Sequence, residues 1–276
     1  MNISYKTILP WSYSKWKSLN NCSLQFYLKY ILKIKGVYVE APETTIGKAA
    51  HSVLENIIMG LDFPKALEKV KPEYEKQLNW KVDVEEGLGS QLLNFQSRFS
   101  AFKRNHEVVK IFQERKVGLR DDFTQTTFFA GDCFYRGVID LCMYLKNGDA
   151  VILDHKTGAP AAMGLTNFQG QLDVYKILSH YGIEQVKGVA TGIHFIRDGQ
   201  IKIGQRSGVE EVEGTIKNNL LFLLSNTIDN LNEAGKIEKK KGSYCKYCDY
   251  AQDCKDKKLD KYVGEPIHVY RTEIET

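Results

Sequence analysis

The chain of 276 residues is 43% hydrophobic and 26% charged, so it has ample apolar material for one large domain or two modest ones. No apolar run approaches the roughly 18 residues that a membrane span needs, and the opening sequence MNISYKTILPWSY lacks a signal-peptide pattern. We therefore expect a soluble, cytoplasmic protein without a membrane partner. The formal net charge of +4 is a mild basic excess, which permits a nucleic-acid partner without requiring one.

The first third of the chain has the apolar spacing of helices. Ser12 is a candidate N-cap for a helical segment that runs to about residue 31. The next helix is expected to begin at Thr44 or Thr45 and to end before Gly60. Two further helical stretches are predicted, over about 63–79 and 88–107.

From about residue 108 the sequence is rich in Val, Ile, Phe and Tyr, with turn signals between the apolar runs, which is typical of short strands. The expected strands are 108–119, 123–130, 133–145, 149–155, 186–197 and 200–206, and the expected helices are 167–181 and 209–233. The pattern predicts an antiparallel meander followed by helix, strand and helix. We expect a single α/β domain over 1–276, divided into a helical N-terminal part (1–107), an α/β core (108–235) and a cysteine-rich tail (236–276).

The stretch VILDHKTG, residues 151–158, ends an apolar run in Asp154, His155 and Lys156. Positions 154 and 156 of a strand point to the same face, so an acid and an amine lie together there. Taken alone, this pair favours an exposed salt bridge at a strand end. The surrounding sequence has to decide between an exposed salt bridge and a pair of functional residues.

The preceding strand places Asp140 inside an apolar run. A buried acid is unfavourable unless it meets a cation or a metal, and pairing with a neighbour such as Arg136 is the structural alternative. Because the two strands are expected to be neighbours, the carboxylates of Asp140 and Asp154 could converge, and a divalent cation would remove their repulsion. Lys156 beside them could orient or activate the water that attacks a phosphodiester.

Two helices supply further candidates. His51 borders the apolar stripe of the helix around 46–58, where a histidine is more often a satisfied core residue. Gln171 and Tyr175 lie at i and i+4 and hence on one face of the helix after the lysine, where ordinary helix surface is the alternative. Four other histidines join no constellation in the sequence: His106, His180, His194 and His268.

The chain has six cysteines, which in the cytoplasm argue against a disulfide framework. Three of them form C-x2-C-x5-C at Cys245, Cys248 and Cys254 and need a fourth ligand. Zinc is one occupant that this spacing permits, although a second C-x2-C is more usual for zinc. Cys133 and Cys142, which we place on one strand, are expected to be small buried residues.

These signals occur in one order along the chain: G-x-x-x-H, G-x-x-D, D-x-K and Q-x-x-x-Y. That order resembles the RecB-type branch of the PD-(D/E)XK nucleases, over about residues 12–255. The resemblance implies a restriction-endonuclease-like α/β core, a mixed sheet flanked by helices, with a helical N-terminal part and a C-terminal iron–sulfur clasp. Its implied catalytic residues are Asp140, Asp154, Lys156, Gln171 and Tyr175. Its implied metal ligands, for Mg²⁺ or Mn²⁺, are His51, Asp140, Asp154 and the backbone carbonyl of His155. Relatives often place an acid on an earlier strand, where this chain has Glu114.

The cysteines resemble those of the iron–sulfur nucleases, which include the AddB nuclease domain and the exonucleases of CRISPR adaptation. By that resemblance Cys22, Cys245, Cys248 and Cys254 would ligate a 4Fe–4S cluster, with zinc the alternative occupant. Relatives commonly have proline after the first cysteine, whereas Ser23 follows Cys22 here, so the local turn differs.

The resemblance implies a metal-dependent DNA exonuclease acting on single-stranded DNA or DNA ends. The pathway stays open among recombination, repair, phage replication and CRISPR adaptation, as does the choice between DNA and RNA. No G-x-x-x-x-G-K-[ST] motif is present, so a helicase would be a separate partner, as would a recombinase or CRISPR-adaptation protein. The alternative function is a non-catalytic DNA-binding module stabilised by a zinc or iron–sulfur site.

Overall fold

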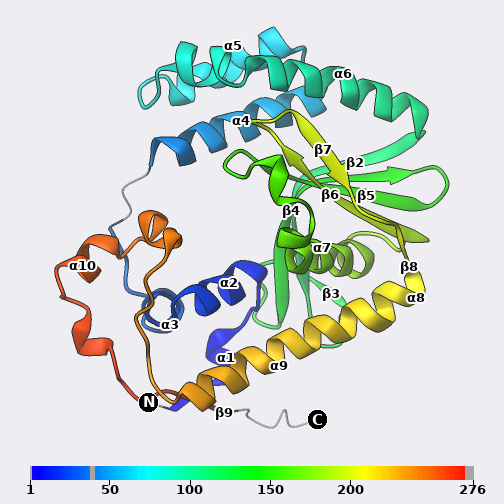
Figure 1. The fold of residues 1–276 in the computed structure, drawn as a ribbon. Helices are drawn as coiled ribbons and strands as arrows, with labels where there is room; N and C mark the ends of the chain where they lie inside the picture. The colour runs from blue at the N-terminus through cyan, green and yellow to red at the C-terminus, as the bar shows by residue number, and fades with distance from the viewer. Residues whose placement is uncertain (1, 38–40, 271–276) are drawn as a thin grey trace. The chain divides into compact units, whose positions relative to one another are not determined.

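The computed structural model describes residues 2–37 and 41–270, and the chain forms two compact units (Figure 1). Unit 1 comprises Met1–Val39, Val117–Gly137 and Glu213–Thr276, and unit 2 comprises Glu40–Lys116 and Val138–Val212. Within the described ranges, none of the helices has the length and apolar character needed to cross a membrane. The prediction of one domain stays a prediction.

Unit 2 is an α/β unit. Its helical elements are α4 (Pro42–Ile58), α5 (Phe63–Tyr74), η2 (Lys81–Glu86), α6 (Gly89–Asn105), η3 (Ala161–Met163), η4 (Thr166–Phe168), α7 (Gln169–Gly182) and α8 (Val209–Glu211). Its strands are β2 (Val108–Leu119), β4 (Tyr135–Leu145), β5 (Asp149–Lys156), β6 (Gly188–Phe195), β7 (Gln200–Ile203) and β8 (Ser207–Gly208). The last residues of β2 and the first of β4 belong to unit 1.

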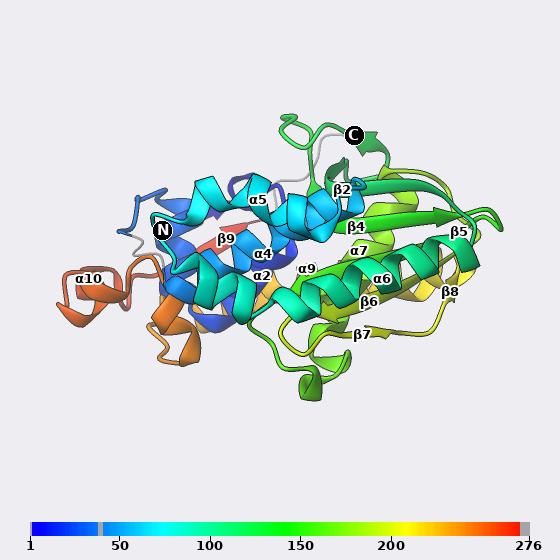
Figure 2. The ribbon, with the colours of Figure 1, turned by 90° about the horizontal axis from the view of Figure 1, so that it is seen from above.

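The sheet of unit 2 is mixed. Its strands lie in the order β2-β4-β5-β6-β7, and β8 pairs with β6. Strands β4 and β5 are antiparallel, whereas β5 and β6 are parallel and are joined through α7, because parallel neighbours need a crossover. Helices α4 and α6 lie on one face of this sheet and α7 on the other (Figures 1 and 2). The predicted mixed sheet flanked by helices is confirmed.

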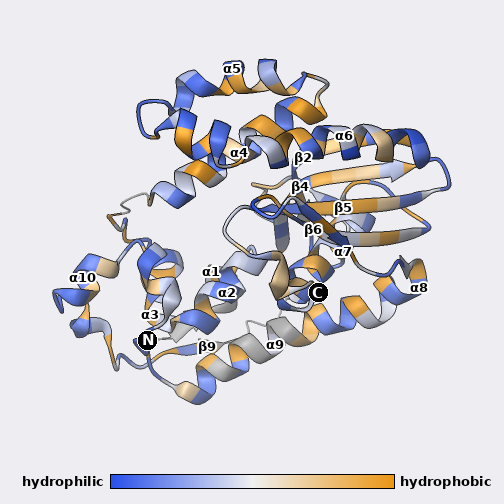
Figure 3. Cartoon of the chain, turned by 45° about the horizontal axis from the view of Figure 1, so that its top comes forward, coloured by the Kyte–Doolittle hydropathy of each residue, from blue (hydrophilic) through white to orange (hydrophobic). Residues whose placement is uncertain are grey.

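The core of unit 2 lies between the sheet and α4, α5 and α6. Helix α4 buries Ala50, Val53, Leu54 and Ile57 on one face, because these positions recur at helical spacing. The hydrophobic stretches of α4 are orange in Figure 3. They pack in one core with alternate residues of β4 and β5, Leu141, Met143, Val151 and Leu153. The helix ends before Gly60, whose positive φ of 104° favours glycine.

Unit 1 joins the two ends of the described chain. Its elements are β1 (Asn2–Ser4), α1 (Tyr5–Ile8), α2 (Tyr13–Asn21), α3 (Ser23–Phe26), η1 (Tyr27–Ile31), β3 (Gln125–Thr126), η5 (Val212–Ile216), α9 (Lys217–Ala234), η6 (Ser243–Tyr247), α10 (Ala251–Lys255), η7 (Asp260–Tyr262) and β9 (His268–Tyr270). Strands β1 and β9 pair in parallel, and a second hydrophobic core contains residues from α3, α9 and the tail. Ser23, which stands where relatives commonly have proline, accepts a hydrogen bond from Glu238 N and donates one to Glu238 O.

Most predicted elements are confirmed, including the cap at Ser12, whose side chain accepts from Lys15 N. The strand predicted over 123–130 is wrong, because only Gln125–Thr126 pairs with β2 and the residues after it form a hydrogen-bonded turn. Cys133 and Cys142 are buried as expected, but Cys133 precedes β4 and so does not share its strand.

The core of unit 2 gives a stability prediction. Leu54 is fully buried in α4, so Leu54→Ala should lower the free energy of unfolding by about 2–5 kcal/mol through lost contacts and a cavity. Met59, at the end of the same helix, is 61% exposed, and Met59→Ala should change it by less than about 0.5 kcal/mol. Urea denaturation measures both, and equal midpoints for the two variants would contradict this assignment of the core.

Candidate active site

Two acids face each other across neighbouring strands of unit 2. Leu141 on β4 pairs with Leu153 on β5, so the antiparallel register brings Asp140 opposite Asp154. Asp154 is buried, with 1% of its surface exposed, and the side chain of Asp140 is 15% exposed. The strands thus hold two carboxylates together, Asp154 at the end of its apolar run and Asp140 within its own.

Asp154 is held from both sides. Its Oδ1 accepts hydrogen bonds from Gln171 Nε2 at 2.9 Å and from the Tyr175 hydroxyl at 3.0 Å. Gln171 Nε2 also lies 2.7 Å from the Tyr175 hydroxyl oxygen, as one helical turn permits. On the other side, Lys156 Nζ lies 2.8 Å from Asp154 Oδ2. The structure therefore brings the predicted D-x-K and Q-x-x-x-Y residues into one cluster.

Asp140 and His51 meet through the backbone of His155. The backbone N–H of His155 donates to Asp140 Oδ2 at 2.9 Å, and its carbonyl oxygen lies 3.0 Å from His51 Nε2. His51 Nδ1 is 3.9 Å from Asp140 Oδ2. Asp140 thus accepts a hydrogen bond from the backbone of His155, and His51 lies beside the same backbone unit.

The electrostatics of the site reflect its crowded acids. Burial, and then repulsion from Asp154, raise the pKa of Asp140 to about 7. Burial also raises the pKa of Glu114 to about 7, with Asp140 and Glu55 adding repulsion. These carboxylates resist ionising together, so the site favours a cation.

A cavity of about 330 Å³ opens beside His51. It is lined by Gly47, Lys48, His51, Ser52, Glu55, Tyr74 and Glu114. Glu114 has a positive φ of 44° within β2, which is uncommon for a residue with a side chain. Glu55 lies one helical turn after His51 and was not singled out from the sequence, although its i+4 spacing from His51 on α4 was a signal.

His194 is a second residue that the sequence reasoning missed. It pairs with His155 in the register of β5 and β6, and the Nδ1 atoms of the two rings are 3.0 Å apart. The ring of Phe95 stacks on His194 at a centroid distance of 4.8 Å. Burial lowers the pKa of His194 to about 3 and lowers the pKa of His155 well below its ordinary value. Both rings are therefore neutral in the core. Only the pairing of the two strands reveals this contact.

The chemistry of the predicted ligands fits a divalent cation. Two carboxylates, a carbonyl oxygen and one imidazole are donors that suit Mg²⁺ or Mn²⁺. Across the described residues, no three or more His, Cys, Asp or Glu side chains form a group that could hold a metal ion as placed. One oxygen of Asp154 is paired with Lys156 instead. The metal ligands named from the sequence therefore stay a prediction.

The four cysteines assigned to a cluster all belong to unit 1 and are free thiols. Cys22 is buried in the hydrophobic core of that unit, and Cys248 and Cys254 pack against the same core. Burial raises the pKa of Cys248, and the nearby Cys22 and Cys245 raise it further. Cys22, Cys245 and Cys248 are thus neighbours. Among the described residues, however, no three cysteines form a group that could hold a metal ion as placed, so the cluster stays a prediction.

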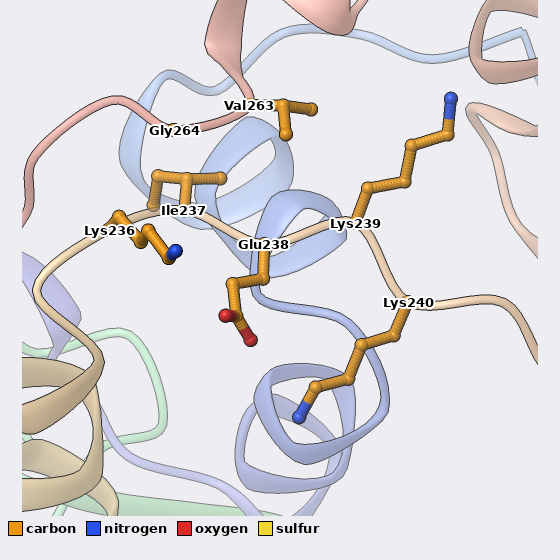
Figure 4. Close-up of a pocket in the computed structure, with 7 residues that line it drawn as sticks. All are labelled: Lys236, Ile237, Glu238, Lys239, Lys240, Val263 and Gly264. Atoms are coloured by element: carbon orange, nitrogen blue, oxygen red, sulfur yellow. The ribbon is translucent and has the colours of Figure 1, made fainter.

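A cavity of about 370 Å³ lies in unit 1, in the segment that leads to these cysteines (Figure 4). It is lined by Lys236, Ile237, Glu238, Lys239, Lys240, Val263 and Gly264. Lys239 is already paired with Asp260 and donates to the carbonyl oxygen of Cys254. Glu238 is the one acid among these lining residues. Metal-assisted hydrolysis needs paired carboxylates, and these lie in unit 2.

A model of the PD-(D/E)XK nuclease superfamily matches residues 10–255. No curated protein matches the sequence. Among solved structures, the fold is similar to that of SSO0001, with 15% identity and a TM-score of 0.33 over 68% of this chain and 79% of that chain. It is also similar to a chain described as "Putative exonuclease" from Eubacterium rectale, with 11% identity and a TM-score of 0.42 over 87% and 93% of the two chains.

Gly47 generates a prediction about the packing of α4 on the end of β5. Alanine normally stabilises a helix relative to glycine by roughly 0.5–1 kcal/mol, but a Cβ at Gly47 would lie 2.8 Å from Thr157 Oγ1. Gly47→Ala should therefore lower the free energy of unfolding by about 1–3 kcal/mol, and adding Thr157→Ala should restore part of it.

The matched control is Gly214→Ala, because nothing lies within 4 Å of a Cβ built there. Thermal unfolding of the three variants measures the effect. If Gly47→Ala were as stable as Gly214→Ala, the close approach of Thr157 to the helix would be refuted.

Proposed function

Because the chain belongs to the PD-(D/E)XK nuclease superfamily, we propose that it is a metal-dependent deoxyribonuclease that hydrolyses phosphodiester bonds of DNA. The observation that carries the proposal is the pair of opposed carboxylates, Asp140 and Asp154, beside the ammonium group of Lys156. An ion pair at a strand end would need only one of the two acids. A second, partly buried acid next to the first favours a site built for a cation.

Asp140 and Asp154 would hold Mg²⁺ or Mn²⁺, with the carbonyl oxygen of His155 and the imidazole of His51 as further donors. When bound, the cation supplies Lewis acidity at the phosphate and lowers the pKa of a bound water. Gln171 and Tyr175 fix Oδ1 of Asp154, which leaves Oδ2 directed toward Lys156. Because three protein groups hold Asp154, its position does not depend on the substrate.

Lys156 has an ammonium group at the edge of this cluster, with 28% of its side chain exposed. It can reach solvent while paired with Asp154, so it can donate to a phosphate oxygen or orient the attacking water. The negative charge that it neutralises grows in the transition state, so its contribution falls mainly on turnover.

We further propose that the enzyme is an exonuclease on single-stranded DNA or DNA ends, in recombination, repair, phage replication or CRISPR adaptation. A helicase or other partner protein would supply unwound strands. The alternative, a non-catalytic DNA-binding module with a zinc or iron–sulfur site, would not need Asp140, Asp154 and Lys156 in one cluster.

The cysteines of unit 1 are proposed to hold a 4Fe–4S cluster, with zinc as the alternative occupant. Support comes from Cys22, Cys248 and Cys254 at one hydrophobic core and from Cys245 beside Cys248, because four thiolates are the donor set such a cluster needs. Hydrolysis requires no electron transfer, so the cluster would act as a clasp between the N-terminal helices and the tail.

Turnover is predicted to require Mg²⁺ or Mn²⁺ and the side chains of Asp140 and Lys156. Lys156→Ala and Asp140→Asn should each lower the rate of DNA cleavage by roughly 10²–10³-fold while DNA affinity changes little. Lys146→Ala is the matched control, because Lys146 is exposed and paired with Glu107. DNA cleavage that persists in EDTA, or near-normal cleavage rates in both variants, would contradict the proposal of a metal-dependent nuclease.

Cys22→Ala is predicted to remove the brown colour of anaerobically purified protein. Opening the long loop between Cys22 and the tail should also lower the melting temperature by roughly 10 °C, by analogy with about 4–5 kcal/mol for a long disulfide loop. Cys133→Ala should keep the colour, because Cys133 lies outside the proposed ligand set and its buried thiol already donates a hydrogen bond to Tyr135 O. Full iron and sulfide in Cys22→Ala, or colourless and iron-free wild-type protein, would rule out the four-cysteine cluster.

A further inference from the structure

The positive charge of the chain is concentrated in one stretch of unit 1. Residues 236–263 contain nine lysines and five acids, so their formal charge of +4 equals the net charge of the whole chain. Four of these lysines fall within the six residues KIEKKK, 236–241, which we call the lysine segment. The rest of the chain is neutral on balance, so a polyanion would be attracted to this stretch.

The backbone of the lysine segment is fixed from two sides. Glu238 N donates a hydrogen bond to Ser23 Oγ at 2.8 Å. On the other side, Ile237 N donates to Glu265 O and Gly264 N donates to Ile237 O, both at 2.9 Å. The segment therefore presents its side chains from an ordered backbone, so less conformational entropy is lost when a ligand binds.

Three ammonium groups of the lysine segment are available to a ligand. Lys236, Lys240 and Lys241 are exposed, and among the described residues no hydrogen bond or ion pair uses their ammonium groups. Lys239 differs, because its Nζ is paired with Asp260 at 3.1 Å. The side chains of Lys239 and Lys240 leave the segment in opposite directions (Figure 4). One lysine thus anchors the segment, and three remain without a partner in the part of the chain that the structure describes.

The cavity of about 370 Å³ in unit 1 lies along the same segment. Two of the free lysines, Lys236 and Lys240, line it. Glu238 is the only acid in the lining, so the two free ammonium groups outnumber the one carboxylate. The segment therefore has a hollow with an excess of positive charge, which suits an anionic group.

We propose that the lysine segment is a binding surface for the phosphate backbone of DNA, contacted through Lys236, Lys240 and Lys241. The proposal rests on the proposed function, because it assumes that the substrate is DNA. Each ammonium group that neutralises a phosphate releases a condensed counterion, which favours binding at low salt. An ammonium group is a compact point charge, so these contacts are independent of base sequence.

The lysine segment does not suit a protein partner. The buried centre of a protein interface is apolar, and lysine is depleted there. Ile237, the one hydrophobic residue of the segment, is 1% exposed and so is covered by the protein itself. Among the residues that line the cavity, Val263 alone exposes a large hydrophobic side chain, at 40%. Charge, rather than apolar area, is what this surface offers to a ligand.

The test is the salt dependence of binding to a single-stranded oligonucleotide, measured by fluorescence anisotropy in EDTA so that the DNA is not cut. The variant tested carries Lys236→Gln, Lys240→Gln and Lys241→Gln together. The slope of log K against log salt should fall by about 2, because each lost phosphate contact removes about 0.7. Affinity at about 0.1 M salt should fall roughly 100-fold as a consequence. In a cleavage assay this variant should raise KM and leave kcat unchanged, because its lysines lie outside the candidate active site.

The matched control carries Lys65→Gln, Lys110→Gln and Lys146→Gln, which change the net charge by the same amount. Each of these exposed lysines is paired with an acid, respectively Asp62, Glu184 and Glu107. Their charge is already balanced locally, so the slope should stay at its wild-type value. Should the first variant fail to fold, Lys241→Gln alone tests the same claim, with an expected fall of about 0.7 in the slope.

A wild-type slope in the lysine-segment variant, while the wild-type protein cuts DNA, would overturn this surface and leave the nuclease assignment intact. Equal losses in the two triple variants would also overturn it, because net charge alone would then account for binding. Wild-type protein that neither binds nor cuts DNA would overturn the proposed function and this inference with it. Poly-glutamate of matched charge that binds the wild-type protein more tightly than the oligonucleotide does would assign the surface to an acidic protein instead.

Discussion

The repulsion between Asp140 and Asp154 is the constraint on which the rest of the site depends. The register of β4 and β5 makes the two carboxylates neighbours, and burial raises the pKa of Asp140 to about 7. A fold would gain nothing from such a pair unless a cation joined them. Both faces of the sheet supply supporting groups, with His51 from α4 on one face and Gln171 and Tyr175 from α7 on the other.

The residue between the acid and the lysine connects these supports. The backbone of His155 binds Asp140 through its N–H and lies within hydrogen-bond distance of His51 through its carbonyl, while its ring pairs with His194 in the core. A shift of β5 would therefore move the acid, the lysine and the backbone partner of Asp140 together. This coupling explains why Asp140, Asp154 and Lys156 all lie on one pair of neighbouring strands.

The sequence predicted the helices around His51 and Gln171 and the strands that carry Asp140 and Asp154, because apolar periodicity is a local signal. It did not predict the contact of His155 with His194, because parallel pairing of β5 with β6 is a long-range property. The strand predicted over 123–130 is wrong because the Phe and Thr residues after Thr126 form a turn, in which Phe129 is exposed, and not a strand of the sheet. Local β-propensity could not reveal that difference.

The most direct test of a cation site between the two carboxylates is anomalous X-ray scattering from crystals soaked in Mn²⁺. We expect a manganese peak in contact with the carboxylates of Asp140 and Asp154, and loss of that peak in crystals of the Asp140→Asn variant. Strong manganese peaks elsewhere in the molecule, with none between these two carboxylates at saturating Mn²⁺, would contradict it.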